Sequence, residues 1–296
     1  MYIDYPQVLP KSYYLLLTVN LITGCLNAGF FLASPGVNQV LDVQETGWRD
    51  DRVDFNNTLI ASIVVFGLMV GSIFSKPILA LGRRRSILLS NLVITFMTIP
   101  YFFVDSLWVL ASTRFVLGVA SAVILNASGL IVGEFIPSEY QVYCGICVNF
   151  GIVAGIFIIN CFNLAFLPYW SDKDPVPAEA KDTYMWRISY SLQLIPVAIT
   201  TLMWLFVFKN EPLRFLIAKT EQEGLKSKAY IEAIRVLREN YELTGDEQSV
   251  VDTYADVCRK LDQAASSSEK PGYRRALTNP AYRRATIICI GLAIAN

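Results

Sequence analysis

Six stretches of this sequence are each long enough to cross a lipid bilayer and contain no charged side chain. They cover residues 12–41, 55–75, 86–104, 115–133, 140–171 and 188–208. A helix needs about 20 apolar residues to cross the hydrocarbon core of a membrane. Because that core offers no water to the peptide groups, a spanning segment must satisfy its own hydrogen bonds. The sequence therefore predicts an all-α integral membrane protein, with a six-helix transmembrane bundle in residues 1–208.

The loop between the second and third stretches predicts the orientation of this bundle. Lys76 and the run Arg83-Arg84-Arg85 place four positive charges there and no negative charge. Short basic loops remain in the cytoplasm under the positive-inside rule. The N-terminus of this multi-pass protein is therefore predicted on the cytoplasmic side. The sequence does not distinguish the plasma membrane from an organelle membrane.

The composition argues against several other classes of protein. The 296 residues carry no net charge, which gives no case for nucleic-acid binding, and they include no histidine. Without histidine, the commonest zinc ligand and the Ser-His-Asp and Cys-His catalytic sets are missing. Cys144 and Cys147 form a C-x-x-C pair, but they lie in an apolar stretch, where cysteines serve as small packing residues. We therefore predict no enzyme activity, no metal and no cofactor.

Charged residues become much more frequent after the sixth stretch. Residues 210–284 make up a quarter of the length and hold half of the charged side chains. Apolar residues recur every four positions from Leu225 to Leu237, which is typical of an amphipathic helix. We predict a cytoplasmic helical linker domain at 209–284. Its charged side chains either face water or contact lipid headgroups through the arginines near the C-terminal end of the segment.

The last twelve residues, 285–296, are apolar again. As a helix they would reach about 18 Å, which is too short to cross a bilayer. We interpret them as the truncated start of a seventh transmembrane helix.

Seven short motifs occur along the chain in the order in which one family of transporters carries them. They are Gly24-Cys-Leu-Asn27-Ala-Gly29-Phe30, Gly82-Arg83-Arg84, Arg114-Phe-Val-Leu-Gly118, Gly133-Glu134-Phe-Ile-Pro137, Gly151-Ile-Val-Ala-Gly155, Asn210-Glu211-Pro-Leu-Arg214-Phe-Leu and Asn279-Pro280-Ala-Tyr282-Arg283. Together they resemble the amino-terminal half of a sugar porter of the major facilitator superfamily. The resemblance implies the first six-helix bundle of a twelve-helix fold, and transport of a hexose-like sugar by alternating access.

The resemblance also implies a gate of charged residues at the cytoplasmic ends of the helices. Paired across helices, these charges hold that face shut, and they separate when the bundle rocks open. The gate residues are Arg83, Arg84, Glu134, Glu211 and Arg214. An exposed ion pair stabilises by only about 0 to 1 kcal/mol, which suits contacts that break on every cycle. Three further residues belong to the family's structural motifs: Gly82, Arg114 and Gly118.

Amides at membrane depth are the candidates for sugar binding, because an amide both donates and accepts hydrogen bonds. The resemblance places Asn160 where the family's span-5 glutamine contacts sugar. Asn149 lies eleven residues earlier, which is three helical turns, and therefore on the same face. Asn20 and Asn27 are seven residues apart in the first span and also share a face. For Asn20, Asn27 and Asn149, hydrogen bonding between helices is an equal alternative.

The chain departs from the family pattern in three of its motifs and in its first span. The motif departures are Leu79, Ala80, Gln141, Val142, Asn210 and Pro212. In the first span, Phe31 stands where proton-coupled relatives carry an acid. Without that acid and without histidine, the expected mode is facilitated diffusion rather than proton symport.

Two hypotheses follow from the length of the resemblance, since the family has twelve spans and binds sugar between two halves. In the first, this is a sugar transporter of which only the first half is present. In the alternative, it is a degenerate, non-transporting, porter-like subunit of a larger membrane protein complex. The expected partners are a sugar, the lipid bilayer, and either the missing C-terminal six-helix half or a partner subunit. No nucleic acid is expected.

Overall fold

The computed structural model describes residues 11–33, 53–103, 106–136, 138–166, 184–224, 227–240, 250–256 and 258–259. These residues lie in helices or in short connections, and none of them forms a strand. Six helices are long and apolar enough to cross a membrane. The predicted all-α, multi-pass membrane fold with six spans is therefore confirmed.

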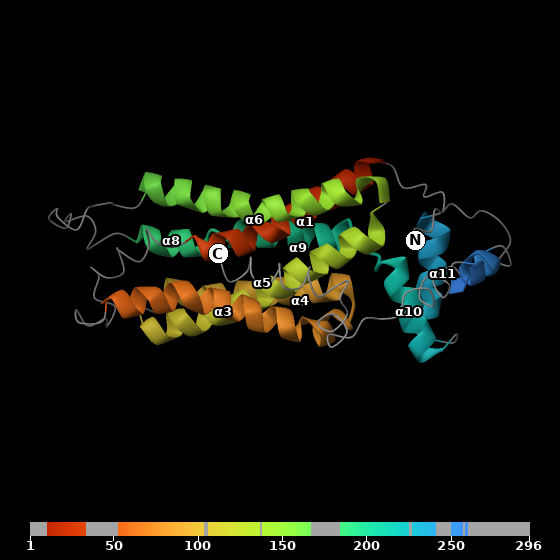
Figure 1. Cartoon of the computed structure of the whole chain (residues 1–296), viewed down its shortest axis with the longest axis horizontal. Helices are drawn as coiled ribbons and strands as arrows, with labels where there is room; N and C mark the ends of the chain where they lie inside the picture. Colours follow the sequence, from red (N-terminus) through yellow and green to blue (C-terminus); the bar gives the residue numbers. More distant parts are fainter. Residues whose placement is uncertain are drawn as a thin grey trace, which may run out of the picture. The chain divides into compact units, whose positions relative to one another are not determined.

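The six spans follow one another along the chain (Figure 1). They are α1 Lys11–Leu32, α3 Val53–Leu79, α4 Arg83–Thr98 with the 3-10 turn η2 Ile99–Phe102, α5 Leu107–Phe135, α6 Ser138–Phe166, and α8 Met185–Ser191 with α9 Leu194–Phe206. The last span is followed by α10 Leu213–Glu223 and α11 Lys228–Asn240, and residues 250–256 and 258–259 are helical as well.

The fourth span, α5, is the centre of the bundle. One apolar cluster joins its first half, including Leu117 and Ile124, to Trp186 of α8. A second cluster joins its other half, including Ala127, to Leu21 of α1. Because both clusters share α5, its side chains are buried along most of its length.

Two pairs of helices approach each other closely at glycines. In the first pair, a Cβ on Gly67 of α3 would collide with the backbone of α5, and one on Gly118 would collide with the backbone of α3. In the second pair, the same holds for Gly29 of α1 against α6, and for Gly155 of α6 against α1. Small residues let membrane helices pack backbone to backbone, where van der Waals contact replaces the missing hydrophobic force.

These two crossings are related by the order of the spans. If each of spans 1–3 is matched with the span three places later, α1 corresponds to α5 and α3 corresponds to α6. The contact of α1 with α6 then corresponds to the contact of α5 with α3. Both α3 and α6 contribute two glycines four residues apart, Gly67 with Gly71 and Gly151 with Gly155. This is the arrangement of an inverted repeat of three helices, which is common in transporter folds.

The sixth span is interrupted between α8 and α9. Pro196 has no N–H to donate, and the Leu192 carbonyl accepts from the Ile195 N–H at 3.2 Å instead. The side-chain nitrogen of Gln193, at the break, donates to the Thr98 hydroxyl at 2.7 Å. The polar side chain at the break is therefore satisfied by a neighbouring span.

The chain divides into two compact units, one from Val8 to Val236 and the other comprising Met1–Gln7 and Leu237–Asn296. The first unit holds all six spans, α10 and most of α11. Helices are present in the segment predicted as a helical linker, while its limits of 209 and 284 remain predictions. The proposed start of a seventh helix at 285–296 lies outside the described residues.

Candidate functional site

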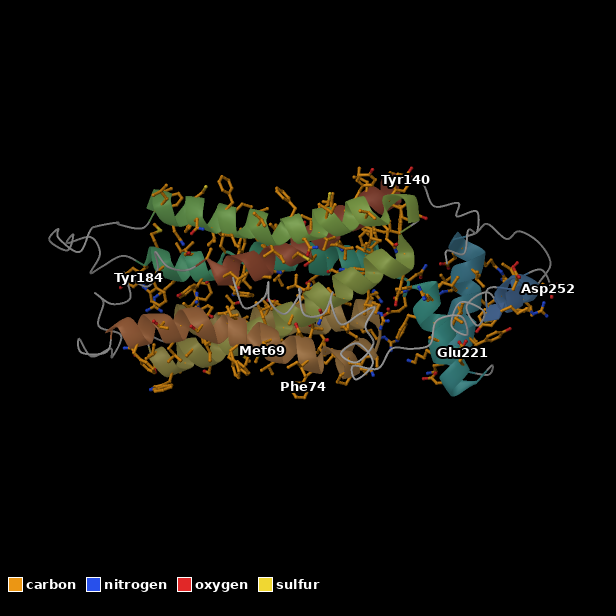
Figure 2. The ribbon with its side chains drawn as sticks, in the orientation of Figure 1. Met69, Phe74, Tyr140, Tyr184, Glu221 and Asp252 are labelled. Carbon is orange, nitrogen blue, oxygen red and sulfur yellow. The ribbon has the colours of Figure 1, made fainter. Side chains whose placement is uncertain are left out.

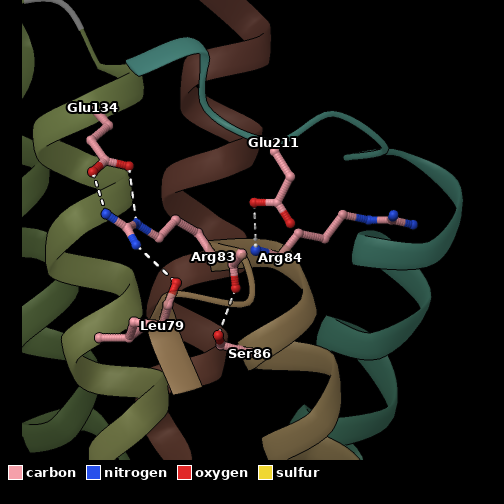
Figure 3. A network of polar contacts seen from close by, with 7 residues as sticks. Leu79, Arg83, Arg84, Ser86, Glu134 and Glu211 are labelled. Atoms are coloured by element: carbon pink, nitrogen blue, oxygen red, sulfur yellow. Dashed lines mark hydrogen bonds and ion pairs between the residues drawn. The ribbon is translucent and has the colours of Figure 1, made fainter. Parts of the chain in front are cut away.

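Charged residues meet at the end of the bundle that carries the connection 80–82 between α3 and α4, which we call the arginine end (Figure 3). Arg83 donates from Nη2 to Glu134 Oε1 at 2.8 Å and from Nε to Glu134 Oε2 at 3.2 Å. Its Nη1 donates to the Leu79 carbonyl at 2.9 Å. The Phe215 ring of α10 lies 4.8 Å from the guanidinium carbon. One side chain therefore links α3, α4, α5 and α10.

Glu211 caps the N-terminus of α4, although it lies far along the sequence. Its Oε2 accepts from the Arg84 backbone N–H at 3.1 Å, and its Oε1 from that of Arg85 at 3.4 Å. The first N–H groups of a helix have no partner within it, and the helix dipole favours a carboxylate there. Gly82 precedes the helix with φ +134°, and a Cβ on it would lie 2.5 Å from Glu211 Oε1. The turn and the cap therefore both require glycine at this position.

Burial and hydrogen bonding shift the pKa of Glu211 in opposite directions. Burial raises the pKa of this carboxyl above its ordinary value of 4.5, because a charged group loses its hydration. The hydrogen bonds from the α4 backbone and the charge of Arg85 lower the pKa, but by less. Since a protonated carboxyl has less capacity to accept bonds, proton uptake weakens the cap.

The other two predicted gate residues lie differently. Arg84 donates from Nε to the Trp204 carbonyl at 2.9 Å, near the end of α9. Arg214 is exposed on α10, and its side chain makes no hydrogen bond or ion pair with the residues that the structure describes. The structure thus brings Arg83, Arg84, Glu134 and Glu211 together and leaves Arg214 outside their network.

A second arginine lies buried toward the opposite end of the bundle. Arg114 of α5 is 1% exposed and donates from Nη1 to the Ile60 carbonyl of α3 at 3.1 Å. The Tyr190 ring of α8 lies 4.4 Å from its guanidinium carbon, a cation–π distance. Gly118 lies one turn further along α5, at the glycine crossing with α3. These two motif residues therefore hold α3, α5 and α8 together.

The three predicted sugar-binding amides do not share one surface. Asn149 and Asn160 are exposed on α6, whereas Asn27 is fully buried in α1. Side chains of α6 project away from the bundle, as Tyr140 does, and those of α3 do the same at Phe74 (Figure 2). The α6 face is otherwise apolar, with Ile146, Phe150, Val153, Phe157 and Leu164 all exposed.

Several contributors to the site were not among the residues predicted from the sequence. The Phe215 ring over Arg83 and the Trp204 carbonyl bonded to Arg84 depend on how helices are rotated. The spacing of Gly67 and Gly71 did carry a signal, because two small residues four apart form a flat stripe on a helix.

The fold is similar to solved structures of xylose transporters. The proton:xylose symporter XylE bound to 6-bromo-6-deoxy-D-glucose matches with a TM-score of 0.64 and 16% identity, over 85% of this chain and 54% of that chain. The inward-open xylose transporter XylE from E. coli matches with a TM-score of 0.63 and 14% identity, over 86% and 57%. This chain therefore spans about half the length of the structures that it resembles.

At these identities the structures show the fold: six spans arranged as in one half of a major facilitator protein. The family assignment comes from the sequence itself. A family model described as "Sugar (and other) transporter" matches residues 19–296, which is nearly the whole chain. The chain therefore belongs to the sugar (and other) transporter family.

Proposed function

We propose that this chain forms the first six-helix half of a transporter that moves a hexose-like sugar across a membrane by alternating access. The observation that carries the proposal is the exposed face of α6, which bears Asn149 and Asn160. Of the six spans, α6 is the least covered by the rest of the chain. An amide facing hydrocarbon leaves its donors and acceptors unbonded, so polar groups in a span normally face protein or a water-filled path.

The chemistry of this face suits a sugar. Ligand sites are mostly apolar, with a few polar groups that fix the orientation of the ligand, and Phe150 and Phe157 lie exposed beside the two amides. A rise of 1.5 Å per residue separates Asn149 from Asn160 by about 16 Å. That distance exceeds the size of a hexose ring, so the two amides contact the sugar at different depths of its path.

The arginine end supplies the gate in this proposal, and the positive-inside rule assigns it to the cytoplasm. The pair of Arg83 with Glu134 ties α4 to α5, and the Glu211 cap ties α4 to the segment after α9. Alternating access requires one face of the bundle to close while the other opens. Contacts that join three helix ends at one face serve that purpose.

Facilitated diffusion is the proposed mode of transport. Phe31, at the position where proton-coupled relatives carry an acid, is buried in the apolar cluster that also holds Trp186 and Tyr190. The buried Arg114 in the same region rests against a ring and a carbonyl. A sugar flux that is unchanged by a protonophore is the expected result, and a flux that the protonophore abolishes would contradict this mode.

Sugar binding by the purified full chain tests the proposal. Intrinsic tryptophan fluorescence is titrated with D-glucose and D-xylose, with L-glucose as the stereochemical control. D-sugars are expected to bind, and Asn160→Leu to weaken binding about tenfold, the loss of one hydrogen bond of about 1 to 1.5 kcal/mol. Cys161→Ser, at the adjacent exposed position, is expected to bind normally. Equal signals from D- and L-glucose would contradict the proposal.

The alternative, a non-transporting subunit of a larger membrane complex, is favoured by the extent of exposed apolar surface on α3 and α6. Such a subunit would use the same α6 face for a protein partner. It predicts no stereospecific sugar binding, together with a stoichiometric membrane protein that co-purifies and that Phe157→Asp displaces.

A further inference from the structure

A second set of amides lies inside the bundle, away from the α6 face. Asn20 and Asn27 of α1 are 2% and 0% exposed, and neither the nitrogen nor the oxygen of either amide has a hydrogen-bond partner among the described residues. The Ser121 hydroxyl of α5, 1% exposed, also has none there. Buried polar groups are costly when they remain unbonded, and most so in a membrane. These three side chains therefore require partners.

The three side chains gather where α1 packs against α5. Seven residues make about two helical turns, so Asn20 and Asn27 lie on the same face of α1. Gly24, between them, faces α5, because a Cβ on it would lie 3.5 Å from the Ile124 side chain. Ser121 lies one turn before Ile124 on α5. Amides of one helix and a hydroxyl of the other are thus placed along one interhelical contact.

Further polar groups border the same region. The Ser128 hydroxyl lies beside the Cys25 thiol, so it too faces α1 from α5. Thr200 of α9 lies 3.8 Å from a Cβ at Gly24 and accepts a hydrogen bond from Asn91 Nδ2 at 3.1 Å. The side-chain oxygen of Asn91, Oδ1, has no partner in the described part of the chain. Four helices therefore contribute polar atoms to the interior of the bundle.

We propose that the contact of α1 with α5 is a binding site for ordered water, bounded by Asn20, Asn27, Ser121 and Ser128, here called the α1–α5 seam. A buried water makes about three hydrogen bonds to polar groups that lack other partners. Each amide presents two donors and an acceptor oxygen, so water molecules between the helices satisfy both kinds of atom. A Cβ at Gly24 would lie at ordinary van der Waals distance from the Ile124 and Thr200 side chains, so the helices pack against each other between the two amides. This assignment is independent of the proposed sugar transport.

Radiolytic footprinting of the full chain in detergent tests the site. An X-ray pulse turns bound water into hydroxyl radicals, which oxidise the side chains that the water touches. Cys25 is a sensitive reporter, because it is fully buried and lies beside Ser128. We expect Cys25 to be oxidised in the folded protein, with the exposed Cys147 as the reference. Trp186, equally buried but outside the seam, is expected to stay unmodified.

Substitutions in the α1–α5 seam test whether the oxidation of Cys25 depends on water bound there. Asn20→Leu and Asn27→Leu remove polar partners of the water, and each is expected to lower Cys25 oxidation about threefold. Asn163→Leu is the matched control, because that buried amide lies on α6, outside the seam, where its oxygen accepts a hydrogen bond from the Ser189 hydroxyl at 2.6 Å. If a leucine variant does not fold, Ser121→Ala replaces it. An unoxidised Cys25 in the unmodified chain, or equal oxidation in seam and control variants, would overturn the proposal.

Discussion

The guanidinium of Arg83 contacts a carboxylate, a carbonyl and an aromatic ring, and burial decides how much these contacts stabilise the fold. The side chains of Arg83 and Glu134 are 15% and 11% exposed. The ion pair of Lys219 with Glu223 on α10 is 3.7 Å long, and its side chains are 30% and 46% exposed. Water screens the second pair, whereas the first is bidentate and largely desolvated. The two pairs therefore provide a comparison within one protein.

Replacing Glu134 by Gln is expected to destabilise the chain by about 1.5 to 3 kcal/mol, because it leaves the Arg83 charge partly buried without its counter-ion. Glu223→Gln is the matched control, and its effect should stay below about 0.5 kcal/mol, as for other helical pairs four residues apart. Unfolding of the purified chain in mixed micelles measures both. Equal losses in the two variants would show that the bidentate pair is no stronger than a surface pair.

At the scale of helices, the N-terminus of α4 depends on a carboxylate that arrives from beyond the sixth span. Because the native state raises the pKa of Glu211, the folded chain binds this proton more tightly than the unfolded chain. The contribution of this group to stability is then fully present below the ordinary value of 4.5, and is lost as pH rises through the raised pKa. Ionised Glu211 thus caps the helix at a cost in desolvation.

Glu211→Gln is expected to remove this pH dependence. As the pH rises above 4.5, the melting temperature of the unmodified chain should fall relative to that of the variant, since only the carboxyl ionises. Glu223→Gln, at an exposed position of α10, should leave the relative trend unchanged. If the unmodified chain instead becomes more stable than the variant as pH rises, the hydrogen bonds from the helix N–H groups lower the pKa of Glu211 by more than burial raises it.

The glycine crossing of α1 with α6 is a second feature of this scale. A Cβ on Gly155 would collide with the Leu26 carbonyl and lie 3.1 Å from the Gly29 Cα, so Gly155→Ala should cost about 1 to 3 kcal/mol through overpacking. Gly145 on the same helix has no atom within 4 Å of such a Cβ. Gly145→Ala should therefore stabilise α6 slightly, by up to about 1 kcal/mol. Thermal unfolding compares the two, and similar losses would argue against close packing at the crossing.

A feature can be predicted from the sequence when it is caused by residues that are neighbours in the chain, and not when it is caused by residues of other helices. The six spans follow from charge-free runs, and the convergence of Arg83, Glu134 and Glu211 follows from their positions at helix ends. The charge-free run of the fourth span begins only at residue 115, whereas α5 begins at Leu107. A charge usually ends a span, but Arg114 is buried inside one, because Tyr190 and the Ile60 carbonyl of other helices receive it.

The contacts of the proposed gate residues depend on how each helix is rotated about its axis, which the sequence does not show. A rotation of α10 by about 100°, the angle between neighbouring residues of a helix, would bring the exposed Arg214 to the position of the buried Phe215, and Arg214 would then face Glu134. The exposure of Asn149 and Asn160, in contrast to Asn27, depends on packing in the same way. The face of α6 that stays uncovered is fixed by its glycine crossing with α1.

At the scale of the whole molecule, the gate proposal requires the arginine end to face the cytoplasm. Leu81, 54% exposed, lies at that end, and Trp108, 71% exposed, lies at the start of α5 and so at the other. A span places its two ends on opposite sides of the membrane. Single thiols at these positions therefore report the orientation of the bundle.

Leu81→Cys and Trp108→Cys are compared in cells that display the chain at the plasma membrane. A membrane-impermeant maleimide is expected to label Trp108→Cys in intact cells, and Leu81→Cys only after permeabilisation, because four positive charges retain that loop inside. The unmodified chain sets the background, since Cys147 and Cys161 are exposed within α6. Labelling of Leu81→Cys in intact cells would place the network of Arg83, Glu134 and Glu211 outside. The proposed gate would then lie on the outer side, and a cytoplasmic gate would have to be sought near Arg114 and Tyr190.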